Sequence, residues 1–226
     1  MSNHPGYWGK SVRVDLTNGE VEEVEHARDF FKKYLGGTGF TTKVLYDEVN
    51  EETDPLGPEN VLIVAPGLLV GPKVPTASKT TIGFKSPVTG GYGKSLVGAK
   101  LGDQLKKAGY DYLVVRGKAD SPTTLIIDES GVSLEDASGL WGLDTREADA
   151  KIKETHEGYS TAIIGPAGEE LSKLAMIECE DRQAGKGGGG TVMGSKNLKA
   201  IAAKGASLPP IHDEDLLDEL NDKWRK

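Results

Sequence analysis

The sequence feature that most limits how this chain can fold is a glycine-rich run at residues 182–199, which includes four consecutive glycines from Gly187 to Gly190. Glycine has no Cβ, so its backbone N–H groups can approach a ligand closely, and successive amides can form a nest for phosphate oxygens. Arg182 can grip a phosphate through two nitrogens, while Lys186 adds a point charge. The run therefore predicts an anion cradle, with a helix that starts near Gly190 and points its N-terminus at the same anion.

Two familiar phosphate-binding motifs do not describe this run. A Walker P-loop has its lysine after the glycines, whereas Lys186 precedes them. The spacing Gly185-x-Gly187-x-x-Gly190 matches the Rossmann fingerprint formally, but any run so dense in glycine would match, and no acidic ribose binder follows. A flexible loop is the structural alternative. The flanking cations and the apolar Val192-Met193 favour the cradle.

Composition and charge exclude several classes of protein. A chain of 226 residues with 37% hydrophobic and 27% charged residues is typical of a soluble globular protein. The net charge of -8 argues against a general nucleic-acid binder. The single cysteine, Cys179, excludes a disulfide or a cysteine-ligated iron–sulfur cluster built from this chain alone, and we expect it to be a buried structural thiol. No apolar stretch approaches the roughly 20 residues that span a bilayer, and no secretory segment follows Met1, so a cytoplasmic, membrane-independent protein is expected.

The pattern of strands and helices does not alternate strictly, which predicts an α+β fold rather than a doubly wound parallel sheet. Two similar stretches, 62–67 and 162–168, each read as an apolar strand followed by a Pro/Gly turn. They indicate an internal duplication or a chance similarity of strand–turn patterns. Residues 1–209 are expected to form one unit, and 210–226 a terminal helix or linker. The expected strands are 11–16, 21–24, 61–65, 80–84, 112–116, 123–127, 162–164, 174–178 and 201–204, and the expected helices are 28–34, 39–49, 101–108, 145–157 (capped by Thr145) and 213–225.

One long segment resembles a known family. The segment consists of Arg182-Gln183-Ala184-Gly185-Lys186-Gly187-Gly188, followed by Val192-Met193-Gly194-Ser195-Lys196-Asn197-Leu198-Lys199-Ala200-Ile201. It is similar to the segment that closes the first domain of the tungsten-containing aldehyde:ferredoxin oxidoreductases. The resemblance covers the chain to about Pro209. Other segments that agree in order are Gly6-Tyr7-Trp8-Gly9-Lys10, Val12-Arg13-Val14-Asp15-Leu16, Tyr34-Leu35-Gly36-Gly37-Thr38-Gly39, Asp54-Pro55-Leu56-Gly57-Pro58-Glu59-Asn60, Ala108-Gly109-Tyr110-Asp111 and Ile164-Gly165-Pro166-Ala167-Gly168-Glu169.

The resemblance implies two packed β-sheets with short helices that cradle a tungsten or molybdenum bis-pyranopterin cofactor. In that family the pterin dithiolenes hold the metal without a protein ligand, and a magnesium ion bridges the pterin phosphates. By resemblance, Arg182 contacts phosphate, Lys79 lies where the family commonly has an arginine facing the cofactor, and the backbone carbonyls of Leu96 and Gln183 bind magnesium. The cofactor-binding residues implied in this way are Lys79, Leu96, Val97, Gly98, Ala99, Arg182, Gln183, Ala184, Gly185, Lys186 and Gly187.

Three positions depart from the family pattern. Leu96 has no polar side chain where the family has asparagine or serine, and Ala99 replaces a glycine. Backbone carbonyls could still bind magnesium, which accepts oxygen ligands from any source. Lys79 lacks the bidentate geometry of an arginine. The segment from Asp136 to Trp141 imitates a pterin-binding motif of the family, but it falls where the family has an ordinary loop.

The resemblance also implies an incomplete enzyme. Family members continue for several hundred residues that carry the cluster-binding cysteines and the acid–base groups, so no catalytic residue is assigned to this chain. We expect a domain or split subunit, inactive alone and assembled into an oligomer. A partner region would bring a 4Fe-4S cluster that passes electrons to ferredoxin. The alternative is a non-catalytic assembly module that has lost the metallocofactor, which Leu96 and Ala99 favour and Arg182 and Lys186 oppose. A generic nucleotide binder is a third possibility.

Overall fold

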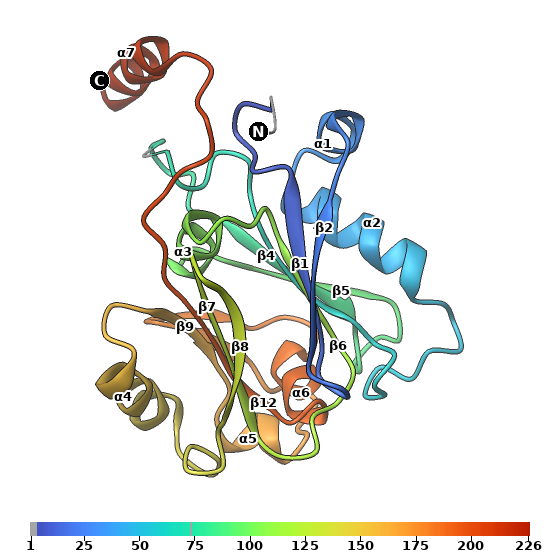
Figure 1. The fold of residues 1–226 in the computed structure, drawn as a ribbon. Helices are drawn as coiled ribbons and strands as arrows, with labels where there is room; N and C mark the ends of the chain where they lie inside the picture. Colours follow the sequence, from blue (N-terminus) through green and yellow to red (C-terminus); the bar gives the residue numbers. More distant parts are fainter. Residues whose placement is uncertain (1–3, 73) are drawn as a thin grey trace.

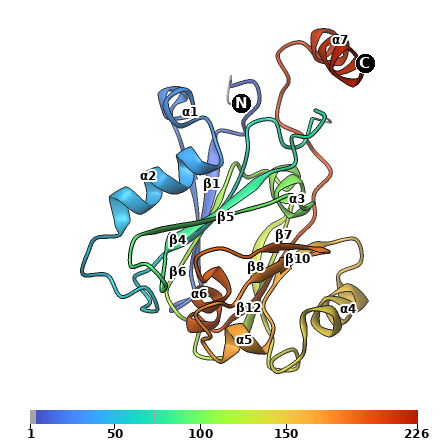
Figure 2. The same ribbon diagram turned by 180° about the vertical axis from the view of Figure 1, so that it is seen from behind.

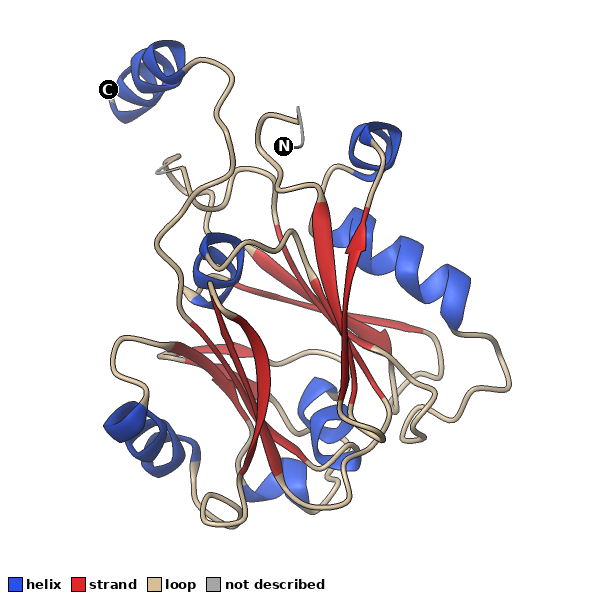
Figure 3. Cartoon of the chain, in the orientation of Figure 1, coloured by secondary structure: helices blue, strands red, loops and turns tan. Residues whose placement is uncertain are grey.

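The computed structural model describes residues 4–72 and 74–226. These residues form two six-stranded sheets that pack face to face, with short helices around them (Figures 1 and 3). The first sheet has the strand order β2-β1-β6-β3-β4-β5, and the second has the order β11-β10-β9-β12-β7-β8. The expected α+β fold with two packed sheets is confirmed.

The elements of the first half are the strands β1 (Lys10–Asp15), β2 (Glu20–Glu25), β3 (Leu62–Pro66), β4 (Thr80–Lys85), β5 (Tyr92–Val97) and β6 (Leu113–Arg116), and the helices α1 (Arg28–Tyr34), α2 (Thr38–Glu48) and α3 (Leu101–Lys107). Those of the second half are the strands β7 (Thr123–Asp128), β8 (Gly131–Asp136), β9 (Ser160–Ile163), β10 (Ile177–Cys179), β11 (Arg182–Ala184) and β12 (Leu198–Ala203), and the helices α4 (Thr145–Thr155), α5 (Pro166–Glu169), α6 (Gly189–Ser195) and α7 (Glu214–Arg225).

The two sheets repeat one topology. In the first, the hairpin β1–β2 is followed by the antiparallel strands β3, β4 and β5, and β6 then returns between β1 and β3, parallel to β1. In the second, the hairpin β7–β8 is followed by β9, β10 and β11, and β12 returns between β7 and β9, parallel to β7. Each returning strand follows a short helix, α3 or α6. This match supports the expected internal duplication, and it makes β5 and β11 equivalent edge strands.

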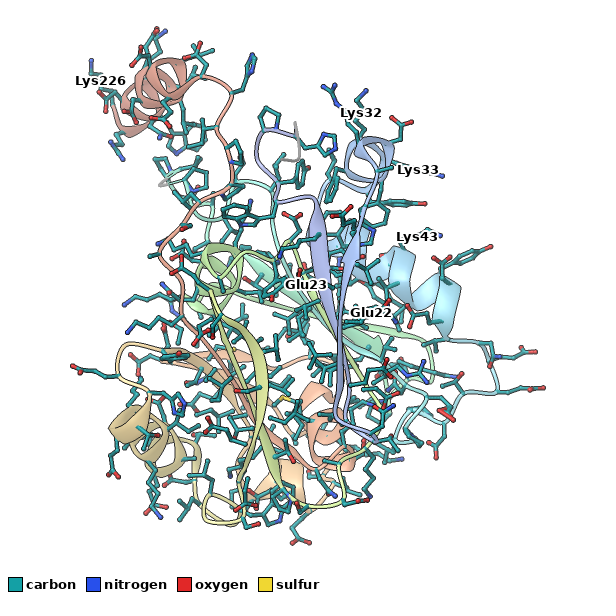
Figure 4. All side chains as sticks on the ribbon, in the orientation of Figure 1. Glu22, Glu23, Lys32, Lys33, Lys43 and Lys226 are labelled. Atoms are coloured by element: carbon teal, nitrogen blue, oxygen red, sulfur yellow. The ribbon has the colours of Figure 1, made fainter. Side chains whose placement is uncertain are left out.

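A shared hydrophobic core fills the space between the sheets. Val12, Leu62 and Leu113 of the first sheet belong to the same buried cluster as Leu125 and Ile201 of the second. The apolar runs of β3 and β6 have little solvent contact because their other faces are covered by α1 and α2 (Figure 1). Outside this core, Lys32 and Lys33 of α1 project from the outer edge of the molecule (Figure 4).

Several sequence expectations differ from the structure at element ends. The strand expected at 174–178 is β10, which begins only at Ile177 and leaves Leu174 80% exposed. The cap of α4 is Asp144 rather than Thr145, because the Asp144 carboxylate accepts hydrogen bonds from the N–H groups of Arg146 and Glu147 and completes a capping box. Four elements, β5, β8, α5 and β11, were not predicted from the sequence. Helix α7 stands apart from the sheets (Figure 1), and no helix among the described residues is both long and apolar enough to cross a membrane.

Replacing Gly194 with alanine tests the close approach of α6 to α5. A Cβ at this position would overlap the carbonyl oxygen of Gly168, which is backbone and cannot rotate away. We expect Gly194→Ala to lower the free energy of unfolding by about 3 kcal/mol, as overpacking of a tight core does. The control Gly139→Ala places its Cβ in open space. Urea denaturation measures both, and equal stabilities for the two variants would contradict the packing described.

Candidate functional site at the seam between the two sheets

The equivalent edge strands β5 and β11 meet, and their junction brings together the two segments implicated by the sequence. The backbone N–H of Lys186 donates a hydrogen bond to Ser95 Oγ at 3.2 Å, and Ser86 Oγ donates to the carbonyl oxygen of Gly187 at 2.8 Å. Figure 2 shows β5 above β10 and α6 from this side. We call the junction, formed by residues 94–100 and 181–187, the edge seam.

Two hollows of about 430 Å³ each lie along the edge seam. The first is lined by Lys94, Ser95, Leu96, Gln183, Gly185 and Lys186. The second lies between the β5–α3 connection, with Gly98 and Ala99, and the start of β11, with Arg182. Each hollow therefore takes residues from both sheets, which explains why neither could be read from one segment alone.

Five cationic side chains border the edge seam without a partner in the protein. They are all exposed and make no side-chain hydrogen bond or ion pair within the described residues: Lys79, Lys94, Lys100, Arg182 and Lys186. The Nζ atom of Lys79 lies 3.2 Å from where a Cβ would stand on Gly98, so this glycine leaves room for the ammonium group. In a chain of net charge -8, unpaired cations gathered at one seam favour an anionic ligand.

Acidic side chains lie at one end of the edge seam only. The second hollow also includes Asp103, Glu180 and Asp181. Glu180 already accepts a hydrogen bond from Ser160 Oγ at 2.9 Å and another from the backbone N–H of Lys100 at 3.4 Å. These contacts hold Glu180 toward the second sheet and toward α3, so it does not neutralise Arg182.

The structure sorts the residues implicated by the sequence into two groups. Seven of them line the hollows or lie beside them with surface available to a ligand: Lys79, Leu96, Gly98, Arg182, Gln183, Gly185 and Lys186. The side chains of Val97, Ala99 and Ala184 are buried in the core instead. Gly187 packs over Phe84, whose ring would lie 3.3 Å from a Cβ at that position. These four can offer a ligand only their backbone.

The glycine run is not one continuous nest. Its first residues form β11, and Gly188, Gly189 and Gly190 are buried against protein rather than open to a ligand. A Cβ on Gly189 would lie 2.8 Å from the Phe84 ring, and the N–H of Gly190 donates to the carbonyl oxygen of Ala175 at 3.1 Å. A helix does begin near Gly190, as expected, but the prediction that its N-terminus faces the anion is wrong. The glycines allow close packing of α6.

The lining of the first hollow suits an anion better than a magnesium ion. Its only oxygen donors beyond Ser95 are the Gln183 amide and backbone carbonyls, and no carboxylate lines it. Within the described residues, no three His, Cys, Asp or Glu side chains are grouped so that they could hold a metal. Magnesium at a protein site usually takes one or two carboxylates. Lys94, which sequence reasoning missed, adds a second ammonium group. No pattern in the sequence of β5 marked it, because the exposed–buried alternation of this strand shows only in the structure.

The family model described as "Aldehyde ferredoxin oxidoreductase, N-terminal domain" matches residues 11–205. The chain belongs to the aldehyde ferredoxin oxidoreductase family. The tungsten-containing aldehyde ferredoxin oxidoreductase of Pyrococcus furiosus is 42% identical over 212 residues, which cover 92% of this chain and 35% of that protein. An aliphatic sulfonate oxidoreductase, WOR-like subunit, from the same organism is 39% identical over 240 residues, covering 97% of this chain and 38% of that protein.

A solved structure confirms the aldehyde ferredoxin oxidoreductase fold. The active site complex BamBC of benzoyl coenzyme A reductase, in complex with 1,5-dienoyl-CoA, superimposes with a TM-score of 0.93 at 35% sequence identity. The match covers 97% of this chain and 34% of the other. The chain thus spans about a third of the length of the relatives it matches.

The one cysteine of this aldehyde ferredoxin oxidoreductase domain lies in the core. Cys179 is fully buried on β10, as expected, and burial, followed by the nearby Glu180 and Glu178 carboxylates, raises the pKa of its thiol to about 12. We therefore expect no alkylation by iodoacetamide at pH 8 in buffer, and complete alkylation in guanidinium chloride. Mass spectrometry measures both. Rapid modification of the native protein would show that β10 opens or that the thiol is accessible.

Proposed function

We propose that this chain is the cofactor-cradling part of an aldehyde:ferredoxin-type oxidoreductase and holds a tungsten or molybdenum bis-pyranopterin from one side. The observation that carries the proposal is the gathering of unpaired cations at the edge seam, because pterin phosphates are anions and the chain as a whole is acidic. The sequence similarity to tungsten-containing relatives also supports a tungsten pterin cofactor as the ligand. The cofactor, when bound, supplies the redox chemistry, and the protein supplies its position and electrostatic environment.

Different residues of the edge seam would contact different parts of the cofactor. Arg182 would grip a phosphate through two nitrogens, and Lys186 would add charge beside it. Lys79, lying over Gly98, would contribute a compact ammonium group at the other end of the seam. Leu96 is 50% exposed and offers an apolar surface to a flat pterin ring. Val97, Ala99, Ala184 and Gly187 would act through their backbone, with residues 1–209 as the cradling unit and 210–226 as a terminal helix or linker.

A partner region would complete the enzyme. The tungsten-containing relatives are about three times as long as the part that this chain matches. We propose that the acid–base groups and a 4Fe-4S cluster lie in such a region, either farther along one chain or in a second subunit of a cytoplasmic oligomer, with ferredoxin as the electron acceptor. Aldehydes or related carbonyl compounds are the proposed substrates. The isolated chain is expected to oxidise none of them.

Metal content of the assembled protein tests this proposal. Co-expressed with its partner region, the chain is expected to purify with tungsten or molybdenum, measured by inductively coupled plasma mass spectrometry. Arg182→Gln is expected to lower the metal content by about tenfold, since a charge-assisted contact to phosphate contributes about 1.5–3 kcal/mol. The control Arg28→Gln removes an exposed arginine from α1, away from the edge seam, and should leave metal content unchanged.

The competing function, an assembly module without a metallocofactor, predicts a different result. It is favoured by Leu96, which leaves one side of the seam without a polar side chain. A well-folded complex that contains neither metal in the wild type would contradict the cofactor proposal and favour the module. Equal metal content in wild type and Arg182→Gln would instead show that the guanidinium group is not a phosphate ligand.

A further inference from the structure

The first hollow of the edge seam differs in charge from four other hollows formed by the described residues. Each of those four has at least one carboxylate in its wall. The hollow between β5 and β11 has two lysines, Lys94 and Lys186, and no acidic residue. Many lysines elsewhere are neutralised, as in the pairs of Lys107 with Asp103 and Lys153 with Asp149. Although the chain is acidic overall, the two lysines Lys94 and Lys186 border one hollow whose wall has no carboxylate to balance their charge.

The backbone fixes how these two lysines approach each other. Along β5 the exposed residues alternate with buried ones, so Lys94 and Leu96 face outward while Ser95 faces inward. Ser95 Oγ accepts the hydrogen bond from the N–H of Lys186. The backbone of Lys186 is thus attached to the residue next to Lys94. The two side chains border the same hollow from different sheets, and neither has to leave a partner in order to bind a ligand.

This arrangement favours direct binding of a phosphate. Two nearby ammonium groups repel each other, and a dianion between them replaces that repulsion with two attractions. A divalent cation entering the same space would be repelled by both. The side chain of Leu96 also offers no oxygen to such a cation. The Gln183 amide, in contrast, can donate a hydrogen bond to a phosphate oxygen.

We propose that Lys94 and Lys186 bind a phosphate group of the pterin cofactor directly, and that this contact needs no magnesium ion. The inference rests on the proposed function for the source of the phosphate, and it adds Lys94 as a binding residue. The ammonium groups of this chain thereby take the place of a bridging metal at the edge seam. The magnesium site implied by the family resemblance at the Leu96 and Gln183 carbonyls is then not required for phosphate binding.

Isothermal titration calorimetry of the purified chain with inorganic pyrophosphate tests this inference. We expect binding in EDTA, and binding in magnesium chloride that is no tighter, because magnesium ions complex pyrophosphate and lower its charge. Lys94→Gln should weaken it by about fivefold, because a largely exposed charge contact is worth up to about 1 kcal/mol. Lys94→Gln/Lys186→Gln should weaken it further. The control Lys118→Gln makes the same change of charge at an exposed lysine outside the hollow and should bind like wild type, with circular dichroism confirming the fold of each variant.

Three results would overturn the inference: no binding by the wild type, binding only with magnesium, or equal affinities for wild type and Lys94→Gln. The outcome is separable from that of the proposed function. An assembled protein that contains tungsten, while its cradling chain binds pyrophosphate only with magnesium, would keep the proposed function and overturn the metal-independent contact. Binding in EDTA that depends on Lys94, in a complex without tungsten, would support the phosphate subsite and contradict the cofactor assignment.

Discussion

The packing of two equivalent sheets on one hydrophobic core is the constraint on which the rest of this structure depends. Each sheet ends in an edge strand followed by a short connection to a helix, β5 to α3 and β11 to α6. Because the sheets lie face to face, these two edges meet. The edge seam is therefore a product of the duplicated topology. The residues that give it charge, Lys94 on one edge and Arg182 and Lys186 on the other, are positioned by backbone that the core holds in place.

Two buried lysines fix the chain after α6. Lys196 Nζ donates to the carbonyl oxygen of Gly117 at 3.0 Å, which ties the second half to the end of β6, and burial lowers the pKa of this lysine to about 8. Lys199 pairs with Glu169 and donates to the carbonyl oxygen of Leu143 at 2.9 Å. A buried charge is tolerated when it is paired or hydrogen-bonded. These lysines carry charge in the glycine-rich segment but are unavailable to a ligand.

Sequence reasoning located the strongly apolar elements and missed the weak ones for a physical reason. Strands such as β3 and β7 are buried on both faces, so their continuous apolar runs were visible. Edge strand β5 carries glycine and lysine, and β11 has only three residues, of which Arg182 and Gln183 are exposed. Neither strand shows the regular alternation of hydrophobic and polar residues that predicts a strand from sequence. The duplication was visible only at 62–67 and 162–168, because the pairing of the strands, not their sequence, is what the halves share.

The glycine run shows the limit of reading a site from one residue type. Glycine is required both where a ligand approaches the backbone and where protein does, and the sequence does not distinguish them. Here Gly189 and Gly190 make room for protein, whereas Gly185 lies at the edge seam beside Met176, whose Sδ would be 2.9 Å from a Cβ there. Met176 is 51% exposed. A large apolar side chain that stays exposed beside a charged hollow supports the proposal that a partner region covers the edge seam.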